Sequence, residues 1–240
     1  MSVAETRPIA ILAALDEEIR AIRRALPVPA GIVTAATGDG PRRAAWGAAL
    51  FLEQHRPLAL VGAGIAGALS AGLAVGDIVA SRRVRSGIGD TPPPDKGLLQ
   101  RALAGGKAKA GTLVTVDRPV VSAGAKAALA AASGGDAVLA VDMESAAWAR
   151  EAAVRGVPFL ILRVISDTVE EELPDFLPAC VGPDGSIRRG EVARRALLHP
   201  GSWGTLLRMR RRLHDASGAL GAFLAELVKA GLVPAGRRRR

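Results

Sequence analysis

The sequence predicts an α/β fold: a single three-layer domain in which a central mixed sheet is flanked by helices. Short apolar runs alternate with amphipathic stretches along the 240 residues, which is typical of strands and helices that follow one another. The chain can bury a sizeable core, since 49% of its residues are hydrophobic, and with only 3% aromatic residues that core must be aliphatic. We expect residues 1–232 to form the domain and the basic residues 233–240 to be a disordered tail.

The predicted strands are short runs of β-branched and aliphatic residues, as in strands buried on both faces. In order they cover residues 8–15, 32–36, 58–62, 77–81, 111–116, 137–141 and 159–165. The predicted helices have apolar residues three or four positions apart and cover 16–26, 41–55, 98–104, 123–132, 144–155, 191–199 and 203–228. The fifth helix ends at Gly156 with Pro158 beyond it, and the last ends before Gly231. The proline-rich residues 87–95 are predicted to form an exposed loop.

Two acidic segments each follow an apolar run that is predicted to be a buried strand. Asp142 and Glu144 follow one run, and Asp167 follows the other. The predicted helix at 144–155 joins them, which gives a strand–helix–strand unit with carboxylates at the carboxyl ends of both strands. Open parallel sheets place their ligands at this edge. The pattern therefore predicts an enzyme that acts on a small molecule.

A third acidic cluster, Asp16, Glu17 and Glu18, opens the first predicted helix. Acidic side chains favour a helix N-terminus because they complement the helix dipole, and this capping role explains most such clusters. One of the three carboxylates could instead point into a cleft and bind a water. Both interpretations remain open from the sequence.

Three glycines, Gly62, Gly64 and Gly67, have the spacing of the dinucleotide fingerprint. They do not follow the first strand, and no suitably placed acidic residue lies about 20 positions further on, so we reject that motif. We expect a turn whose backbone amides approach a ligand closely. Residues 37–43 likewise open a helix with Gly and Arg, which suits either an anion or a tight turn.

Composition narrows the classes of function. The single cysteine, Cys180, excludes an internal disulfide, and the scattered histidines have no ligand spacing, so we expect no metal. The absence of a leader and of a run of about 18 apolar residues predicts a cytoplasmic protein. Few aromatic residues accompany the net charge of +9, so nucleic acid is not an expected partner. The basic last helix packs on the sheet through its apolar side or meets an anionic membrane surface.

Three further side chains lie within predicted elements. Arg163 belongs to a predicted buried strand and is expected to pair with a carboxylate, either to orient Glu144 or Asp167 or as a purely structural pair. Trp148 and Trp203 are expected to lie in the core.

Five short motifs occur in the order and roughly the spacing of one enzyme family. They are Ala14-Leu15-Asp16-Glu17-Glu18, Gly64-Ile65-Ala66-Gly67, Val75-Gly76-Asp77-Ile78-Val79, Val141-Asp142-Met143-Glu144 and Ile165-Ser166-Asp167. On these motifs the chain resembles the purine nucleoside phosphorylase/nucleosidase superfamily, and especially the methylthioadenosine/S-adenosylhomocysteine nucleosidases. Residues 117–120, 142–145 and 183–185 are more similar to the hopanoid-biosynthesis-associated phosphorylases. The resemblance implies a nucleoside phosphorylase-like fold, a homodimer, and no cofactor beyond phosphate as a possible co-substrate.

The resemblance also implies a role for each matching position. Glu18 corresponds to the carboxylate that activates the attacking water, and Glu144 to the residue that binds the ribose hydroxyls. Asp167 corresponds to the acid that protonates purine N7, with Ser166 in support. Other residues would line the sugar pocket or the base segment, namely Met143, Ala66, Gly67, Pro119 and Val120.

The chain departs from the family at three positions. Ile65 stands where the nucleosidases usually have Ser, Pro119 where an aromatic residue is common, and Ala68 where Gly is usual. We therefore expect the substrate to be an adenine nucleoside with a larger or more apolar 5′ group than methylthio, such as adenosylhopane. Its cleavage would release adenine.

The nucleophile is left open between water and phosphate. Glu18 favours water, and we lean toward hydrolysis. A phosphate site would favour phosphorolysis, and its possible residues are Gly38, Gly40, Arg42 and Arg43. A non-catalytic nucleoside-binding member of the fold is the remaining alternative.

Overall fold

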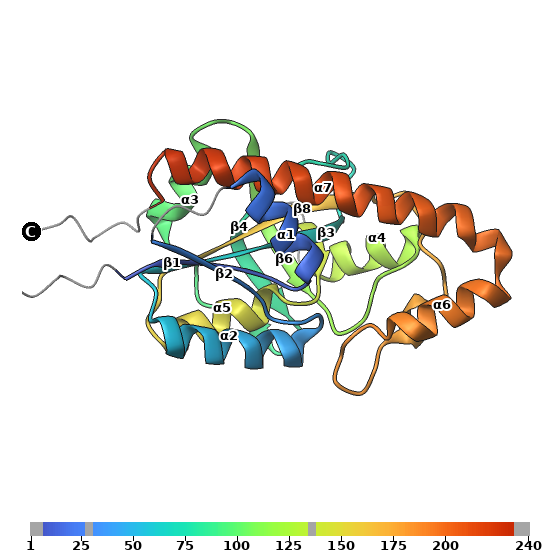
Figure 1. Cartoon of the computed structure of the whole chain (residues 1–240). Coiled ribbons are helices and arrows are strands. Elements are labelled where there is room, and N and C mark those ends of the chain that lie inside the picture. The colour runs from blue at the N-terminus through green and yellow to red at the C-terminus, as the bar shows by residue number, and fades with distance from the viewer. Residues whose placement is uncertain (1–6, 27–30, 134–137, 233–240) are drawn as a thin grey trace, which may run out of the picture.

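The computed structural model describes residues 7–26, 31–133 and 138–232, in which an eight-stranded mixed sheet lies between layers of helices (Figure 1). The strands are β1 Ile9–Ala13, β2 Ile32–Ala36, β3 Ala59–Ala68, β4 Ile78–Ser86, β5 Gly89–Asp90, β6 Ala108–Thr115, β7 Val138–Asp142 and β8 Phe159–Asp167. The helices are α1 Asp16–Ala25, α2 Pro41–His55, α3 Lys96–Leu103, α4 Ala123–Ala132, α5 Ser145–Val154, α6 Arg189–Leu198 and α7 Trp203–Lys229. Two short 3₁₀ turns, Leu177–Cys180 and Pro200–Ser202, precede α6 and α7. The predicted three-layer α/β fold is confirmed.

Part of the sheet is a closed ring, because β8 joins the two ends of the run β3-β7-β6-β4. The strand order is β2-β1-β3-β7-β6-β4-β5, and β8 pairs with both β3 and β4. β3 runs parallel to β1 and β8 but antiparallel to β7. The carboxyl ends of β7 and β8 therefore meet at the end of β3, where Gly67 pairs with Val141 on one side and with Asp167 on the other.

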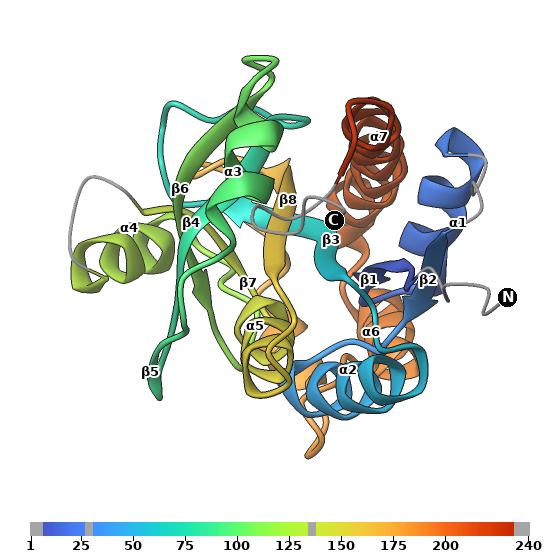
Figure 2. The same ribbon diagram turned by 90° about the vertical axis from the view of Figure 1, so that its left-hand side faces the viewer.

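Alternate residues of the strands supply two separate cores, as the period of two in a strand requires. In β1, Ala10 and Leu12 pack with α2 and α5, whereas Ile11 and Ala13 pack with α1, α3 and α7. Figure 2 shows α2 beside α5 on one side of the sheet and α1 beside α7 on the other. Each fully buried Leu or Ile side chain contributes about 1.5–3 kcal/mol through the hydrophobic effect, so both helix layers are fixed firmly to the sheet.

The expected glycine turn is wrong. β3 continues through Gly62, Gly64 and Gly67, and none of the three has a positive φ. Their small size leaves room for neighbouring side chains instead: a Cβ at Gly62 would lie 2.6 Å from Ile161 and 2.7 Å from Trp148. The glycines are therefore packing positions within a strand.

Three other predictions need correction. β7 and β8 are not a parallel pair of an open sheet, because each pairs with β3 and in opposite directions. The loop predicted at 87–95 contains the short strand β5, which pairs with an extended β4. Trp148 is fully buried as predicted, but Trp203 is 50% exposed because it starts α7 at the α6–α7 junction.

Two sequence predictions involve residues that the structure does not describe. The predicted tail at 233–240 lies there, and so does Ala137, the first residue of a predicted strand. Within the residues that the structure describes, no helix is both long and apolar enough to cross a membrane.

Candidate active site

A buried arginine lies at the centre of the acidic residues. Arg163 of β8 is 0% exposed, and its Nε lies 2.7 Å from Oδ2 of Asp142. Its Nη2 lies 3.5 Å from Oε2 of Glu144, and its Nη1 donates to the carbonyl oxygen of Ile65. The guanidinium also lies over the ring of Trp148, 4.8 Å from the ring centroid. The expected pairing of Arg163 with a carboxylate is confirmed.

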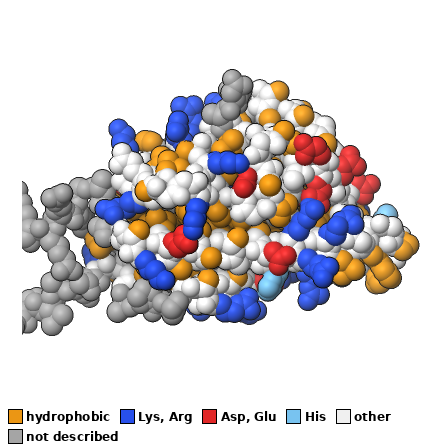
Figure 3. Space-filling view, turned by 90° about the horizontal axis from the view of Figure 1, so that it is seen from above, with side chains coloured by type: hydrophobic (Ala, Val, Ile, Leu, Met, Phe, Trp, Pro, Cys, Tyr) orange, Lys and Arg blue, Asp and Glu red, His pale blue; other side chains and the backbone are white. Residues whose placement is uncertain are grey.

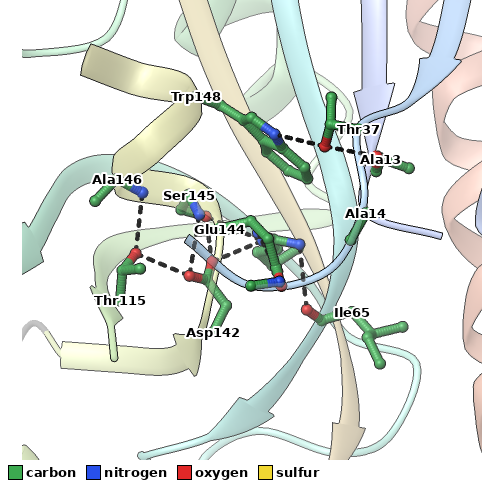
Figure 4. A network of polar contacts seen from close by, with 12 residues as sticks. Ala13, Ala14, Thr37, Ile65, Thr115, Asp142, Glu144, Ser145, Ala146 and Trp148 are labelled. Atoms are coloured by element: carbon green, nitrogen blue, oxygen red, sulfur yellow. Dashed lines mark hydrogen bonds and ion pairs between the residues drawn. The ribbon is translucent and has the colours of Figure 1, made fainter. Parts of the chain in front are cut away.

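Asp142 is the structural partner in this network. Its Oδ1 accepts hydrogen bonds from Oγ1 of Thr115 at 2.8 Å and from the backbone N–H of Ser145 at 3.2 Å, and its Oδ2 accepts one from Oγ of Ser145. Oγ1 of Thr115 in turn accepts from the N–H of Ala146 at 3.0 Å. Figure 4 shows how these contacts join the ends of β6 and β7 to the start of α5. Asp142 thus fixes the backbone that carries Glu144.

Glu144 is buried and stands at the N-cap of α5. Its Oε1 accepts a hydrogen bond from the N–H of Gly40 at 3.0 Å. Burial raises the pKa of Glu144 from 4.5 to about 7, and the negative charges of Asp142 and Glu18 add to this effect, while Arg163 and the Gly40 N–H oppose it. Near neutral pH, Glu144 can therefore hold or release a proton.

Glu18 is the one residue of the first acidic cluster whose side chain turns inward. Asp16 and Glu17 are exposed, and Glu17 pairs with Arg189, whereas Glu18 is 3% exposed. Its carboxylate accepts from the N–H groups of Ala14, Leu15 and Ile65 at 3.1, 2.9 and 3.1 Å. Burial raises the pKa of Glu18 despite the opposing charge of Arg163 and these hydrogen bonds. The capping interpretation is confirmed, because Glu18 closes the first turn of α1 through the N–H groups of Ala14 and Leu15. That its carboxylate binds a water in a cleft stays a prediction.

Asp167 ends β8 and has a partner on each carboxylate oxygen. Oδ1 accepts from Oγ of Ser166 at 2.7 Å, and Oδ2 lies 2.7 Å from Nζ of Lys126. Oγ of Ser166 also lies 3.2 Å from the carbonyl oxygen of Ala66. A Cβ at Gly67 would lie 2.9 Å from Oδ2, so the glycine leaves room for this carboxylate. Lys126 was not predicted, because a lysine in an alanine-rich helix gives no signal that it is buried.

The predicted carboxylates come together around three consecutive residues of β3. The N–H of Ile65 contacts Glu18, the carbonyl of Ala66 contacts Ser166, and Gly67 lies against Asp167. Glu144 joins them through Arg163, which donates to Ile65. Such an arrangement of acids, bases and hydrogen-bond partners can perform acid–base chemistry on a bound molecule.

The predicted residues of the sugar and base segments lie at the edge of this group. Met143 is half-buried between Asp142 and Glu144. Pro119 and Val120 are half-buried in the segment between β6 and α4, and Val120 packs beside Val114 and Val141. Their expected contacts with sugar and base stay predictions.

The possible phosphate residues make contacts of their own. Gly40 has a φ of +83°, and a Cβ there would lie 2.2 Å from the carbonyl oxygen of Gly185, so only glycine fits. The N–H of Gly40 donates a hydrogen bond to Oε1 of Glu144. Nε of Arg43 lies 2.8 Å from Oδ2 of Asp184, and Arg42 is exposed. Gly38 has a φ of +91° and lies against the Arg43 side chain. None of these contacts tests phosphate binding, but the N–H of Gly40 and the guanidinium of Arg43 are each paired with a carboxylate.

Two surface hollows lie elsewhere on the molecule. One is lined by the segment before β1 and the C-terminal ends of α2 and α5, and the other by Pro92, Pro93 and residues 156–159. The first lies beside the amino end of β1 and the second at the amino end of β8, and neither is lined by Glu18, Glu144 or Asp167.

The chain is similar to a known protein family and to named enzymes of bacteria. Residues 29–182 match the model of the phosphorylase superfamily. A 5′-methylthioadenosine/S-adenosylhomocysteine nucleosidase of Haemophilus ducreyi is 35% identical over 167 residues, which is 59% of this chain and 71% of the relative. One from Listeria monocytogenes is 28% identical over 206 residues, covering 68% of this chain and 88% of the relative.

Solved structures show the same fold. The nucleosidase of that name from Helicobacter pylori, in complex with a substituted pyrrolidin-3-ol, has a TM-score of 0.70 at 18% identity, and the match covers 94% of this chain and 99% of that chain. The futalosine hydrolase of the same organism has a TM-score of 0.71 at 19% identity, covering 94% and 98%. The family model and the nucleosidase relatives place the chain in a nucleoside-cleaving class of enzymes. The chain belongs to the phosphorylase superfamily, and the resemblance of its five motifs to the nucleoside phosphorylases and nucleosidases is confirmed. The finer resemblance to the hopanoid-biosynthesis-associated phosphorylases stays a prediction.

Proposed function

We propose that this enzyme cleaves the N-glycosidic bond of a purine nucleoside, with adenine as the leaving base and a modified 5′ group on the ribose. The observation that carries the proposal is the gathering of Glu18, Glu144 and Asp167 around residues 65–67 of β3. Two relatives of this chain are named 5′-methylthioadenosine/S-adenosylhomocysteine nucleosidase, which supports an adenine nucleoside as the substrate.

Each carboxylate has a task in this reaction. Breaking the bond leaves positive charge on the ribose and negative charge on the base. Asp167 donates a proton to the purine, and general acid catalysis of this kind is worth about 10²–10⁴-fold. Glu144 accepts hydrogen bonds from the ribose hydroxyls, which strengthen as the sugar becomes positive. Glu18 takes the proton of the water that attacks the anomeric carbon.

We favour water over phosphate as the nucleophile. An anion site needs N–H groups and guanidinium groups that face the ligand. The N–H of Gly40 and the guanidinium of Arg43 are instead paired with Glu144 and Asp184. Three backbone amides hold the buried Glu18 in place, which suits a base that positions a water.

We further propose that the 5′ group is large and apolar, as in adenosylhopane, and that the enzyme works in the cytoplasm at a membrane surface. The support is a group of exposed apolar residues at the α6–α7 junction, each 50–72% exposed, which we name the junction patch: Leu197, Leu198, Trp203 and Leu207. Residues 188–215 around it contain eight arginines and only two carboxylates. Figure 3 shows apolar and basic side chains mixed at this end of the molecule. Apolar side chains ringed by cationic ones are typical of surfaces that bind anionic lipid.

Vesicle binding tests the membrane part of the proposal. The protein should sediment with phosphatidylglycerol vesicles and much less with phosphatidylcholine vesicles. Trp203→Ser should weaken this binding at least about fivefold, since it removes an interfacial side chain. Ile88→Ser is the control, because Ile88 is 84% exposed between β4 and β5, away from the junction patch. Equal binding by both variants would contradict the proposal.

A homodimer is also part of the proposal. Trp46 and Leu50 on α2 and Val154 on the adjacent α5 are exposed apolar side chains, as an interface between two copies requires. Light scattering after size-exclusion chromatography measures the mass in solution. A mass of about one chain would contradict the dimer without affecting the assignment of the reaction.

The reaction is tested by following free adenine. The protein is incubated with adenosine, methylthioadenosine and 5′-alkyl adenosines, each with and without phosphate. We expect adenine release that is independent of phosphate and fastest with long alkyl groups. Formation of a ribose 1-phosphate would move the assignment to phosphorolysis. Binding of the nucleosides without release under either condition would identify a non-catalytic member of the fold.

A further inference from the structure

The one buried residue of helix α4 is a lysine, Lys126. Lys126 is 0% exposed, and no other residue of α4 is buried. Lysine is almost never fully buried unless its charge is paired. Nζ donates to Oδ2 of Asp167 at 2.7 Å and to the carbonyl oxygens of Thr168 and Glu171 at 2.5 and 3.0 Å. An ammonium group has three N–H donors, so all of them are used.

This contact makes the two oxygens of Asp167 unequal. Lys126 occupies Oδ2, which leaves Oδ1 as the oxygen that can carry a proton. Oδ1 contacts Oγ of Ser166, which also reaches the carbonyl oxygen of Ala66. A hydroxyl has one hydrogen and two lone pairs. Ser166 can therefore donate to an ionised Oδ1, or donate to Ala66 and accept from a protonated Oδ1.

We propose that Lys126 is a positioning residue that fixes Oδ2 of Asp167 and directs the catalytic proton to Oδ1. The inference rests on the proposed function, in which Asp167 protonates the departing purine. In that reaction the proton that Asp167 delivers sits on Oδ1, while the hydroxyl of Ser166 donates to the carbonyl oxygen of Ala66. As the glycosidic bond breaks, its electron pair passes to the base and the proton passes from Oδ1 to a purine nitrogen. Asp167 is then a carboxylate again, and Ser166 donates to Oδ1.

A purely structural ion pair between α4 and β8 predicts a different result. Loss of Lys126 would then reduce activity toward every substrate alike, through misfolding or a displaced helix. Loss of proton delivery affects only leaving groups that need a proton. Nitrophenolate leaves without one, so a nitrophenyl riboside separates the two roles.

The test compares Lys126→Met with wild type on a 5′-alkyl adenosine and on 4-nitrophenyl riboside. We expect kcat for the adenosine to fall at least about 100-fold with its KM within about threefold, and kcat for the riboside to stay within about threefold. Lys109→Met is the control, because Lys109 makes an exposed ion pair with Asp77 outside the site, and it should leave both rates unchanged. An equal loss on both substrates, or no loss on either, would overturn the inference.

Loss of one partner of a buried pair can unfold the protein, so a second variant is needed. Lys126→Arg keeps the charge, but a planar guanidinium cannot direct its donors as an ammonium does. We expect about a tenfold loss of kcat on the adenosine with unchanged KM. A rise in KM at unchanged kcat would overturn the inference. If wild type itself cleaves no purine nucleoside, the proposed function fails. If wild type cleaves it and the Lys126 variants cleave it equally well, only the inference about Lys126 fails.

Discussion

Glu144→Gln should stabilise the protein above neutral pH while it removes activity. Burial and neighbouring negative charges raise the pKa of Glu144 from 4.5 to about 7 in the folded protein. The native state thus holds this proton more tightly than the unfolded chain does, so the free energy of unfolding falls as pH rises from 4.5 to 7 and levels off above. A pKa difference of about 2.5, at about 1.4 kcal/mol for each pH unit, gives a cost of about 3 kcal/mol for the ionised carboxylate. Glutamine does not ionise and avoids this cost.

Urea unfolding of both proteins between pH 5 and pH 8 measures the effect. The Gln variant should be about 3 kcal/mol more stable at pH 8, and the gap should close toward pH 5. Glu53→Gln is the control, because Glu53 is exposed on α2. At each pH this variant should have the same free energy of unfolding as wild type. A Gln variant that is no more stable than wild type at pH 8, or a gap independent of pH, would refute the reasoning.

Two further predictions concern the same network. Arg163→Met leaves Asp142 buried without its cation and should cost about 3–5 kcal/mol in urea unfolding; a loss below about 1 kcal/mol would show that the pair is dispensable. Gly64→Ala places a Cβ 2.3 Å from Nη1 of Arg163 and should cost about 1–3 kcal/mol. Gly124→Ala, which meets open space at the start of α4, should be neutral or stabilising by about 0.5 kcal/mol, and equal effects of the two alanines would contradict the packing argument.

Local patterns in the sequence predicted most of the fold and three of the site's carboxylates. Short aliphatic runs predicted seven of the strands, because strands buried on both faces consist of such residues. Gly156 and Pro158 predicted where α5 ends. Glu18, Glu144 and Asp167 were found from motifs that follow these strands. In the structure, Glu18 contacts Ile65 of β3 and Glu144 contacts Arg163 of β8, so these two motifs lie beside the same strands.

Long-range packing explains what the sequence could not predict. The glycines of β3 resemble a turn in sequence, and only the positions of Trp148 and Arg163 show why a strand lacks side chains there. The role of Lys126 depends on where α4 docks against β8, 41 positions further along the chain. Closure of the sheet by β8 is likewise set by pairing partners that no local pattern contains.

Turnover by Asp167→Asn tests the central claim most directly. Adenine release from a 5′-alkyl adenosine is measured for wild type, for Asp167→Asn and for Asp77→Asn, whose carboxylate pairs with Lys109 outside the site. If Asp167 protonates the departing base, its variant loses at least about 100-fold in kcat while Asp77→Asn keeps the wild-type rate. Near wild-type release by Asp167→Asn would contradict the claim that these carboxylates converge on one glycosidic bond.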